Sequence, residues 1–140
     1  TWIGFDLNAF DGMDGGYANT LGHDATGRFV PYVAFGAGGK IVVDPLIDYD
    51  MPGAGDYYLL AHDSGKPQAL EPYPYEVDGK TQLITTLAFP VKVNDEVIGV
   101  GGVDILLKDV ADLIRDTRPL GEGYISVLSN GGLYVAERNE

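Results

Sequence analysis

The sequence predicts an α+β domain built on an antiparallel sheet, and three observations carry this prediction. Runs of β-forming residues are short and are separated by turn residues, with 20 Gly and 8 Pro among 140 residues. The two longest runs flank a tight turn and predict one long hairpin. Stretches with helical spacing are few and short. This combination favours one antiparallel sheet with short helices.

The first half of the chain predicts three strands and then a helix. Trp2 and Phe10 are large apolar anchors of an alternating run. Pro45 and Pro52 block regular structure before the helix, and Asp56 is favoured at its first turn. The expected elements are a strand at 1–10, a polar Gly-rich loop at 11–26, paired strands at 28–35 and 40–43, an irregular segment at 44–55 and a helix at 56–62.

The second half predicts the longest hairpin of the chain and a helix after it. Pro72 and Pro74 demote their run to a short or edge strand. Asp78-Gly79 predicts a hairpin turn. The expected elements are a short strand at 68–75, a long hairpin of 81–92 with 96–107, a helix at 108–116 and a last hairpin of 123–128 with 133–136.

The composition excludes several classes of partner. A net charge of −12 repels nucleic acid and anionic lipid headgroups. The absence of Cys excludes disulfides and thiolate metal sites. No apolar run is long enough to span a bilayer, and both ends read as cut from a longer chain. Any membrane contact is therefore expected through flanking segments.

Segments spread along the chain carry a family resemblance. They are Asn8-Ala9-Phe10-Asp11-Gly12, Gly22-His23-Asp24-Ala25-Thr26-Gly27-Arg28-Phe29, Gly55-Asp56-Tyr57-Tyr58, Glu71-Pro72-Tyr73 and Gly99-Val100-Gly101-Gly102-Val103-Asp104. In this order they resemble the double Cache extracytoplasmic sensor domains of bacterial methyl-accepting chemotaxis proteins and sensor kinases. The resemblance implies a membrane-distal PAS-like ligand-binding module at 1–107, a linking helix at 108–119 and the first hairpin of a membrane-proximal module at 120–140.

The same resemblance implies a ligand site. Amino-acid sensors of this family place an Arg-x-Trp-Tyr segment before the helix, a Tyr on the next strand and an Asp at the end of the last strand. Tyr57, Tyr58, Tyr73 and Asp104 occupy the aromatic and Asp positions, but Gly55 stands at the Arg position. Arg is the bidentate clamp for an α-carboxylate.

Without that clamp, the site suits a cation or a nitrogen-rich ring. Asp56, Asp104 and the tyrosine faces favour an amine, a quaternary amine or a purine over an amino acid. A carboxylate ligand would need Arg28 or a bound cation. The resemblance also implies a homodimer in the full receptor, with this part in the periplasm and the receptor in the inner membrane.

Other readings of single motifs remain. Asp48, Asp50 and Asp56 partly mimic a calcium loop, although Pro52 and Leu59 replace two ligands that such a loop needs. A second reading is a hydrolase or isomerase using three residues without a nucleophile motif; these are His23, Asp24 and Asp104. We expect no catalytic residue, metal or cofactor. The expected function is ligand sensing in chemotaxis; the alternative is the sensor of a histidine kinase or cyclase that binds a carboxylate, possibly with calcium.

Overall fold

The computed structural model describes residues 1–77 and 80–136 and confirms the α+β class. Its strands are β1 (Trp2–Phe5), β2 (Pro31–Phe35), β3 (Ile41–Pro45), β4 (Gln68–Ala69), β5 (Tyr73–Val77), β6 (Lys80–Val93), β7 (Glu96–Leu106), β8 (Val127–Leu128) and β9 (Tyr134–Ala136). Its helices are α1 (Asp56–Ser64) and α2 (Leu107–Ile114), with 3₁₀ turns at Asp14–Gly16, Ala37–Gly39 and Pro119–Gly121.

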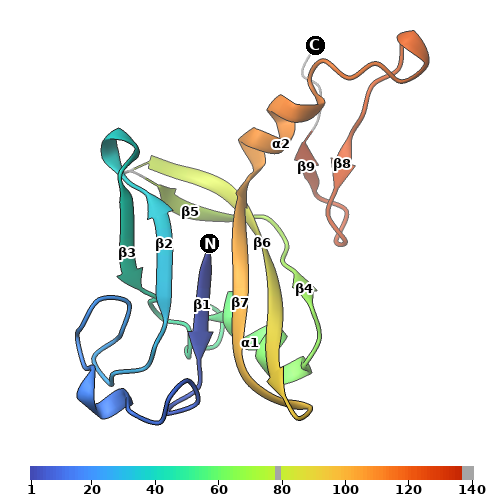
Figure 1. Cartoon of the computed structure of the whole chain (residues 1–140). Helices are drawn as coiled ribbons and strands as arrows, with labels where there is room; N and C mark the ends of the chain where they lie inside the picture. The colour runs from blue at the N-terminus through green and yellow to red at the C-terminus, as the bar shows by residue number, and fades with distance from the viewer. Residues whose placement is uncertain (78–79, 137–140) are drawn as a thin grey trace. The chain divides into compact units, whose positions relative to one another are not determined.

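One sheet has seven strands in the order β3-β2-β1-β7-β6-β4, and β5 also pairs with β6 (Figure 1). A second sheet consists of β8 and β9. The chain divides into two compact units. Unit 1 is Thr1–Gln68 with Leu87–Val103, and unit 2 is Ala69–Thr86 with Asp104–Glu140. Both β6 and β7 contribute residues to each unit.

Unit 1 has its own hydrophobic core. The core residues are Trp2, Val30, Leu46, Tyr49, Tyr58, Ala61, Ala88 and Val100. β1 pairs with both β2 and β7, so Trp2 lies opposite Tyr32 on one side and Gly102 on the other. A Cβ on Gly102 would lie 2.2 Å from the indole of Trp2. Gly102 therefore leaves the space that the ring fills.

The first strand is shorter than the alternation predicts. β1 ends at Phe5, and Asn8 adopts a left-handed backbone with φ 58°. The Asn8 backbone N–H donates to the Asp14 carboxylate at 2.5 Å, and the Asp14 N–H donates to the Asn8 side chain at 3.3 Å. Phe10 is 55% exposed, and its ring packs at a tilt against the rings of Phe5 and Phe29. The expected strand at 1–10 is therefore wrong beyond Phe5, because side-chain bonds of the Asx type replace strand pairing.

The expected hairpins and the first helix of unit 1 are confirmed. β2 and β3 pair from Pro31↔Pro45 to Phe35↔Ile41. Asn94 and Asp95 both have positive φ, at 52° and 66°, as the tight turn between β6 and β7 requires. α1 begins at Asp56 and ends at Ser64, and the capping residue Gly65 closes the last turn with a left-handed φ of 59°.

Unit 2 contains the pairing of β5 with β6, α2 and the β8–β9 hairpin. The expected strand at 68–75 is two strands, β4 and β5, separated by Leu70, Glu71 and Pro72. The helix expected at 108–116 is found as α2, and the last hairpin is found as β8 and β9. The predicted Asp78-Gly79 turn lies outside the described residues. In the part of the chain that is described, neither helix is long and apolar enough to cross a bilayer.

Candidate ligand-binding site

A chain of polar side chains crosses neighbouring strands in unit 2. The Tyr73 hydroxyl lies 2.6 Å from Thr86 Oγ1, and Thr86 Oγ1 donates to Asp104 Oδ1 at 2.8 Å. A threonine hydroxyl has one proton, so Tyr73 donates to Thr86 while Thr86 donates to Asp104. Thr86 is fully buried. We call these residues the Tyr73–Thr86–Asp104 relay.

Strand alternation explains why the relay forms. Tyr73 on β5 lies opposite Ile84 on β6, and Ile84 and Thr86 are two residues apart on the same buried face. β7 also pairs with β6 and carries Asp104 near its end. The structure therefore brings together two residues that the sequence assigned to the ligand, and adds Thr86 between them.

Burial and the charge of Asp104 raise the pKa values of two tyrosines in unit 2. Burial raises the pKa of Tyr73 to about 12; the hydrogen bond to Thr86 opposes that shift and the Asp104 charge adds to it. Burial also raises the pKa of Tyr75, again with a contribution from Asp104. Tyr75 lies two residues after Tyr73 on β5, so both rings face the same side. Tyr75 is not among the residues predicted from the sequence, although its spacing of two from Tyr73 indicates a shared side of the strand.

An anionic group beside phenol rings has a definite chemical preference. A cation gains both the Coulomb attraction of the carboxylate and the attraction of an aromatic face. A carboxylate ligand would meet the Asp104 charge unless a cation lay between them. The arrangement in unit 2 therefore suits a protonated amine or another positively polarised nitrogen group.

The remaining predicted residues lie in unit 1, on or near α1. Asp56 accepts a hydrogen bond from the Gly53 N–H at 2.8 Å and so closes the turn before the helix. The Tyr57 hydroxyl donates to the Ile47 carbonyl at 2.7 Å, and its ring meets Trp2 edge-on at 5.2 Å. Tyr58 is 3% exposed and belongs to the core.

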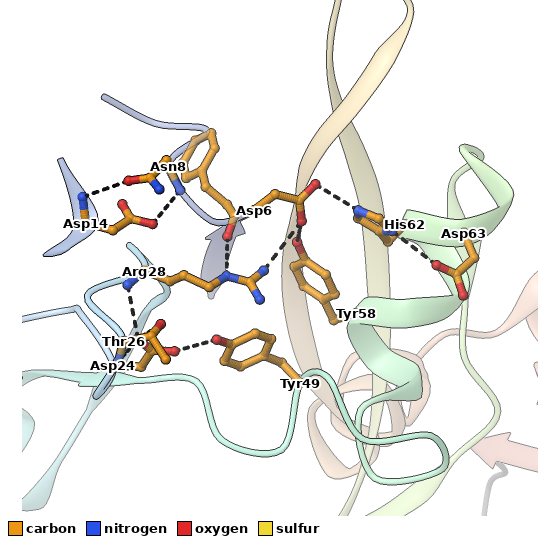
Figure 2. Close-up of polar contacts among 11 residues, drawn as sticks. Asp6, Asn8, Asp14, Asp24, Thr26, Arg28, Tyr49, Tyr58, His62 and Asp63 are labelled. Atoms are coloured by element: carbon orange, nitrogen blue, oxygen red, sulfur yellow. Dashed lines mark hydrogen bonds and ion pairs between the residues drawn. The ribbon is translucent and has the colours of Figure 1, made fainter. Parts of the chain in front are cut away.

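Asp6 connects Tyr58 and Arg28 in unit 1 (Figure 2). The Tyr58 hydroxyl donates to Asp6 Oδ1 at 3.0 Å, and Arg28 Nη2 lies 3.4 Å from the same oxygen. Arg28 Nε also donates to the Phe5 carbonyl at 2.9 Å, and the guanidinium lies 4.7 Å from the ring centroid of Tyr49. The Arg28 side chain is 16% exposed. The N–H donors and the flat face of the Arg28 guanidinium therefore already contact other residues of unit 1.

Asp6 is not predicted as a site residue from the sequence, because it lies in the run that predicts a strand. Its partners come from distant parts of the sequence: Arg28 follows the loop after β1, and Tyr58 lies on α1. No short sequence motif predicts such a contact. A polar residue directly after a short buried strand was the only local signal.

His23 and Asp24, which the enzyme hypothesis uses, contact other groups of the protein. Asp24 accepts hydrogen bonds from Thr26, from the Arg28 N–H and, at 2.5 Å, from the Tyr49 hydroxyl. His23 stacks on Tyr17, and its Nδ1 lies near Thr20 and the Leu21 carbonyl. Within the described residues, no group of three or more His, Asp or Glu side chains could hold a metal ion.

A separate cleft of about 450 Å³ lies in unit 2. Its lining residues come from β6, α2 and β9: Thr81, Gln82, Leu83, Leu107, Lys108, Ala111, Tyr134, Val135 and Ala136. The lining carries the Lys108 ammonium and does not include Tyr73 or Asp104. The cleft is thus distinct from the relay.

A family model and two known chemotaxis proteins are similar to this chain in sequence. A family model described as the methyl-accepting chemotaxis protein-like first PDC sensor domain matches residues 8–112. The chemotaxis protein TlpQ of Pseudomonas aeruginosa is 31% identical over 153 residues, covering 99% of this chain and 21% of TlpQ. PscA of Pseudomonas syringae pv. tomato is 36% identical over 85 residues, covering 61% of this chain and 13% of PscA. The matched part of the chain thus spans about a fifth of TlpQ and about an eighth of PscA.

Three solved structures are similar over 79% to 99% of this chain. The extracellular domain of a protein described as the histidine kinase mmHK1S-Z3 superposes with a TM-score of 0.78 at 35% identity, covering 97% of this chain and 47% of that domain. A structure of methyl-accepting chemotaxis protein X gives 0.72 at 33% identity, covering 99% and 50%. The ligand-binding domain of PctB from Pseudomonas aeruginosa, in complex with L-Arg, gives 0.50 at 25% identity, covering 79% and 47%.

Proposed function

Because this chain belongs to the methyl-accepting chemotaxis protein-like family of PDC sensor domains, we propose that it is the ligand-binding part of a transmembrane chemoreceptor and senses a small amine. The family is one of sensor domains rather than of enzymes. In this proposal the domain lies in the periplasm, and flanking segments anchor the receptor in the inner membrane as a homodimer. A purine is the second choice of ligand and an amino acid the third.

The observation that carries this proposal is the Tyr73–Thr86–Asp104 relay. The relay holds the Asp104 carboxylate beside part-buried phenol rings. Such a group binds a protonated amine through its charge, and the ring faces contribute cation–π attraction. We propose Asp104 and Tyr73 as the contacts of this ligand in unit 2. Asp56, Tyr57, Tyr58 and Arg28 lie in unit 1 and stay predictions made from the sequence.

The surroundings of Arg28 support an amine over an amino acid. An α-carboxylate needs a bidentate donor pair, and Gly55 supplies no side chain for it. Arg28 already pairs with Asp6 and the Phe5 carbonyl. Recruiting Arg28 to a ligand would break these contacts and leave Asp6 without its guanidinium partner. PctB was solved with L-Arg, which keeps an amino acid among the candidates.

A kinase sensor is the second candidate function, and the similarity to mmHK1S-Z3 at 35% identity favours it. In that case the same module would control phosphorylation rather than methylation-dependent chemotaxis. A carboxylate ligand, possibly with calcium, would then be the alternative to an amine. The two outputs differ in segments beyond this chain, so the module's chemistry is common to both.

We further propose that residues 1–107 form the membrane-distal module, 108–119 the link and 120–140 the start of the membrane-proximal module. α2 begins at Leu107, three residues after Asp104, which supports a direct route from ligand to link. A ligand that contacts Asp104 would bias the end of β7 and the start of α2. A differential affinity of about 1–3 kcal/mol between two receptor states is typical of such coupling.

A thermal-shift panel of amines, purines, amino acids and short carboxylates, each with and without a chelator, tests the ligand class. A ligand at about 100 times its dissociation constant adds about 2.7 kcal/mol of stability. We expect chelator-independent shifts with amines. Shifts confined to amino acids or carboxylates would refute the amine proposal, and chelator-sensitive shifts would point to calcium.

A further inference from the structure

His62 lies between two carboxylates at the last turn of α1 (Figure 2). Its Nε2 is 3.0 Å from Asp6 Oδ2, and its Nδ1 is 3.1 Å from Asp63 Oδ1. The ring also stacks on Tyr58, with centroids 5.5 Å apart and planes 19° apart. These contacts join the helix to the residue that directly follows β1.

We propose that Asp6 and His62 form a proton-dependent latch that fixes α1 to the end of β1, tight when His62 is protonated and loose when it is neutral. The latch would make the mobility of α1 respond to the acidity of the surroundings. Through the predicted ligand residues Asp56, Tyr57 and Tyr58 on α1, it would also make ligand affinity depend on pH; this last step rests on the proposed function.

The number of hydrogen-bond donors on the His62 imidazole supports this proposal. A carboxylate only accepts, and both ring nitrogens face a carboxylate oxygen. A neutral imidazole has a single N–H and can satisfy one of the two, leaving a nitrogen lone pair against the other carboxylate. Only the imidazolium donates to both. Deprotonation therefore costs a hydrogen bond and adds a repulsive contact.

Only one of the two carboxylate oxygens of Asp6 loses a partner when His62 is deprotonated. Arg28 and the Tyr58 hydroxyl both approach Oδ1, whereas His62 approaches Oδ2. Losing the His62 proton leaves these two contacts intact and weakens the contact between β1 and the last turn of α1. Partial burial would lower the pKa of His62, but the bonds and charges of Asp6 and Asp63 outweigh it and raise the pKa above 6.5.

Hydrogen exchange of the α1 amides in the ligand-free chain tests the latch directly. Protection factors, corrected for the intrinsic effect of pH, should fall as pH rises through the titration of His62. The pKa of His62, followed by NMR of its ring protons, should mark the upper end of this fall, which begins near pH 6.5; His62→Gln removes that resonance and so assigns it. Each pH unit by which the measured pKa of His62 exceeds 6.5 corresponds to about a tenfold change in the protection factors of α1.

Matched variants separate the latch from a purely structural contact. His62→Gln can still donate to Asp6 but cannot titrate, so its α1 protection should be independent of pH. His62→Lys is a permanent cation in this range and should also give a flat profile. A wild-type profile that is flat, or a His62→Gln profile that still falls with pH, would overturn the proposal. Because no ligand is present, failure of the amine hypothesis would leave this result unaffected.

Discussion

Thr86 is the residue whose hydroxyl holds Tyr73 and Asp104 together. It is fully buried and makes both bonds of the relay through a single oxygen. Thr86→Val keeps the branched shape and removes that oxygen, so two polar groups lose a partner. We expect a loss of about 1–3 kcal/mol in the free energy of unfolding, measured by urea denaturation.

Thr86→Ser is the matched control, because it keeps the hydroxyl and loses a methyl group. It should bind an amine ligand as the wild type does, with only the modest destabilisation of a small cavity. Equal stability of Thr86→Val and the wild type would show that the relay contributes little to the fold.

At the residue scale, the sequence predicted part of the site. Tyr73 and Asp104 were found because they match a family pattern, and the structure joins them through Thr86. Thr86 itself looked like an ordinary strand residue, since its role depends on two neighbouring strands. Asp6 was missed for the same reason: its partners lie 22 to 56 positions away in the sequence.

At the scale of elements, the contact of β1 with β7 depends on Gly102. The Trp2 indole covers this position, and a Cβ there would lie 2.2 Å from the ring. Gly102→Ala should destabilise the domain by about 1–3 kcal/mol through overpacking. It should also change the fluorescence of Trp2, the single tryptophan of the chain.

Gly101→Ala is the control for this substitution. A Cβ on Gly101 would have its nearest neighbour at 3.8 Å, an ordinary van der Waals distance. Both positions lie on β7, so the backbone cost of the change is similar. If the two variants melted at the same temperature, the packing of Trp2 over Gly102 would be wrong.

Element types were predictable where local chemistry decides them. Asn94-Asp95 and Gly36 to Gly39 mark tight turns, and both hairpins are present. The length of β1 was not predictable, because the pairing of Asn8 with Asp14 competes with strand formation over residues that alternate well. The position of β1 between β2 and β7 was likewise not encoded locally, since strand order depends on contacts between distant segments.

At the scale of the whole molecule, stability should depend on pH in opposite senses on the two sides of a plateau. The pKa of His62 is raised above 6.5, so its contribution is complete below pH 6.5 and is lost as pH rises through the folded pKa. Burial would raise the pKa of Asp24, but bonds from Tyr49, Thr26 and Arg28 lower it below 3.8. Its contribution is complete above pH 3.8 and is lost as pH falls through the folded pKa.

Urea denaturation between pH 3 and pH 9 checks this expectation. The free energy of unfolding should be highest between about pH 4 and pH 6.5 and should decline on both sides. His62→Gln should flatten the alkaline side, and Tyr49→Phe should reduce the acid-side decline by removing a bond to Asp24. A wild-type stability that rises from pH 6 to pH 8 would contradict the sign assigned to His62.

The composition predicted the broad character of the molecule better than its site. A charge of −12 and the short β-rich runs indicated an acidic α+β domain, and that class is confirmed. Family membership is confirmed by the match over residues 8–112. The ligand class stays a prediction, because it depends on which charges the folded chain leaves for a ligand.

Calorimetric titration of one amine, the strongest in the thermal-shift panel, into Asp104→Asn and Asp109→Asn tests the central claim most directly. Both variants lose one carboxylate from unit 2, but Asp109 lies exposed in the first turn of α2. We predict that Asp104→Asn weakens binding by about tenfold to a hundredfold, as for the loss of a charged hydrogen bond, while Asp109→Asn binds as the wild type does. Unchanged affinity in Asp104→Asn, with the fold intact, would contradict the assignment of Asp104 as the ligand's anionic partner.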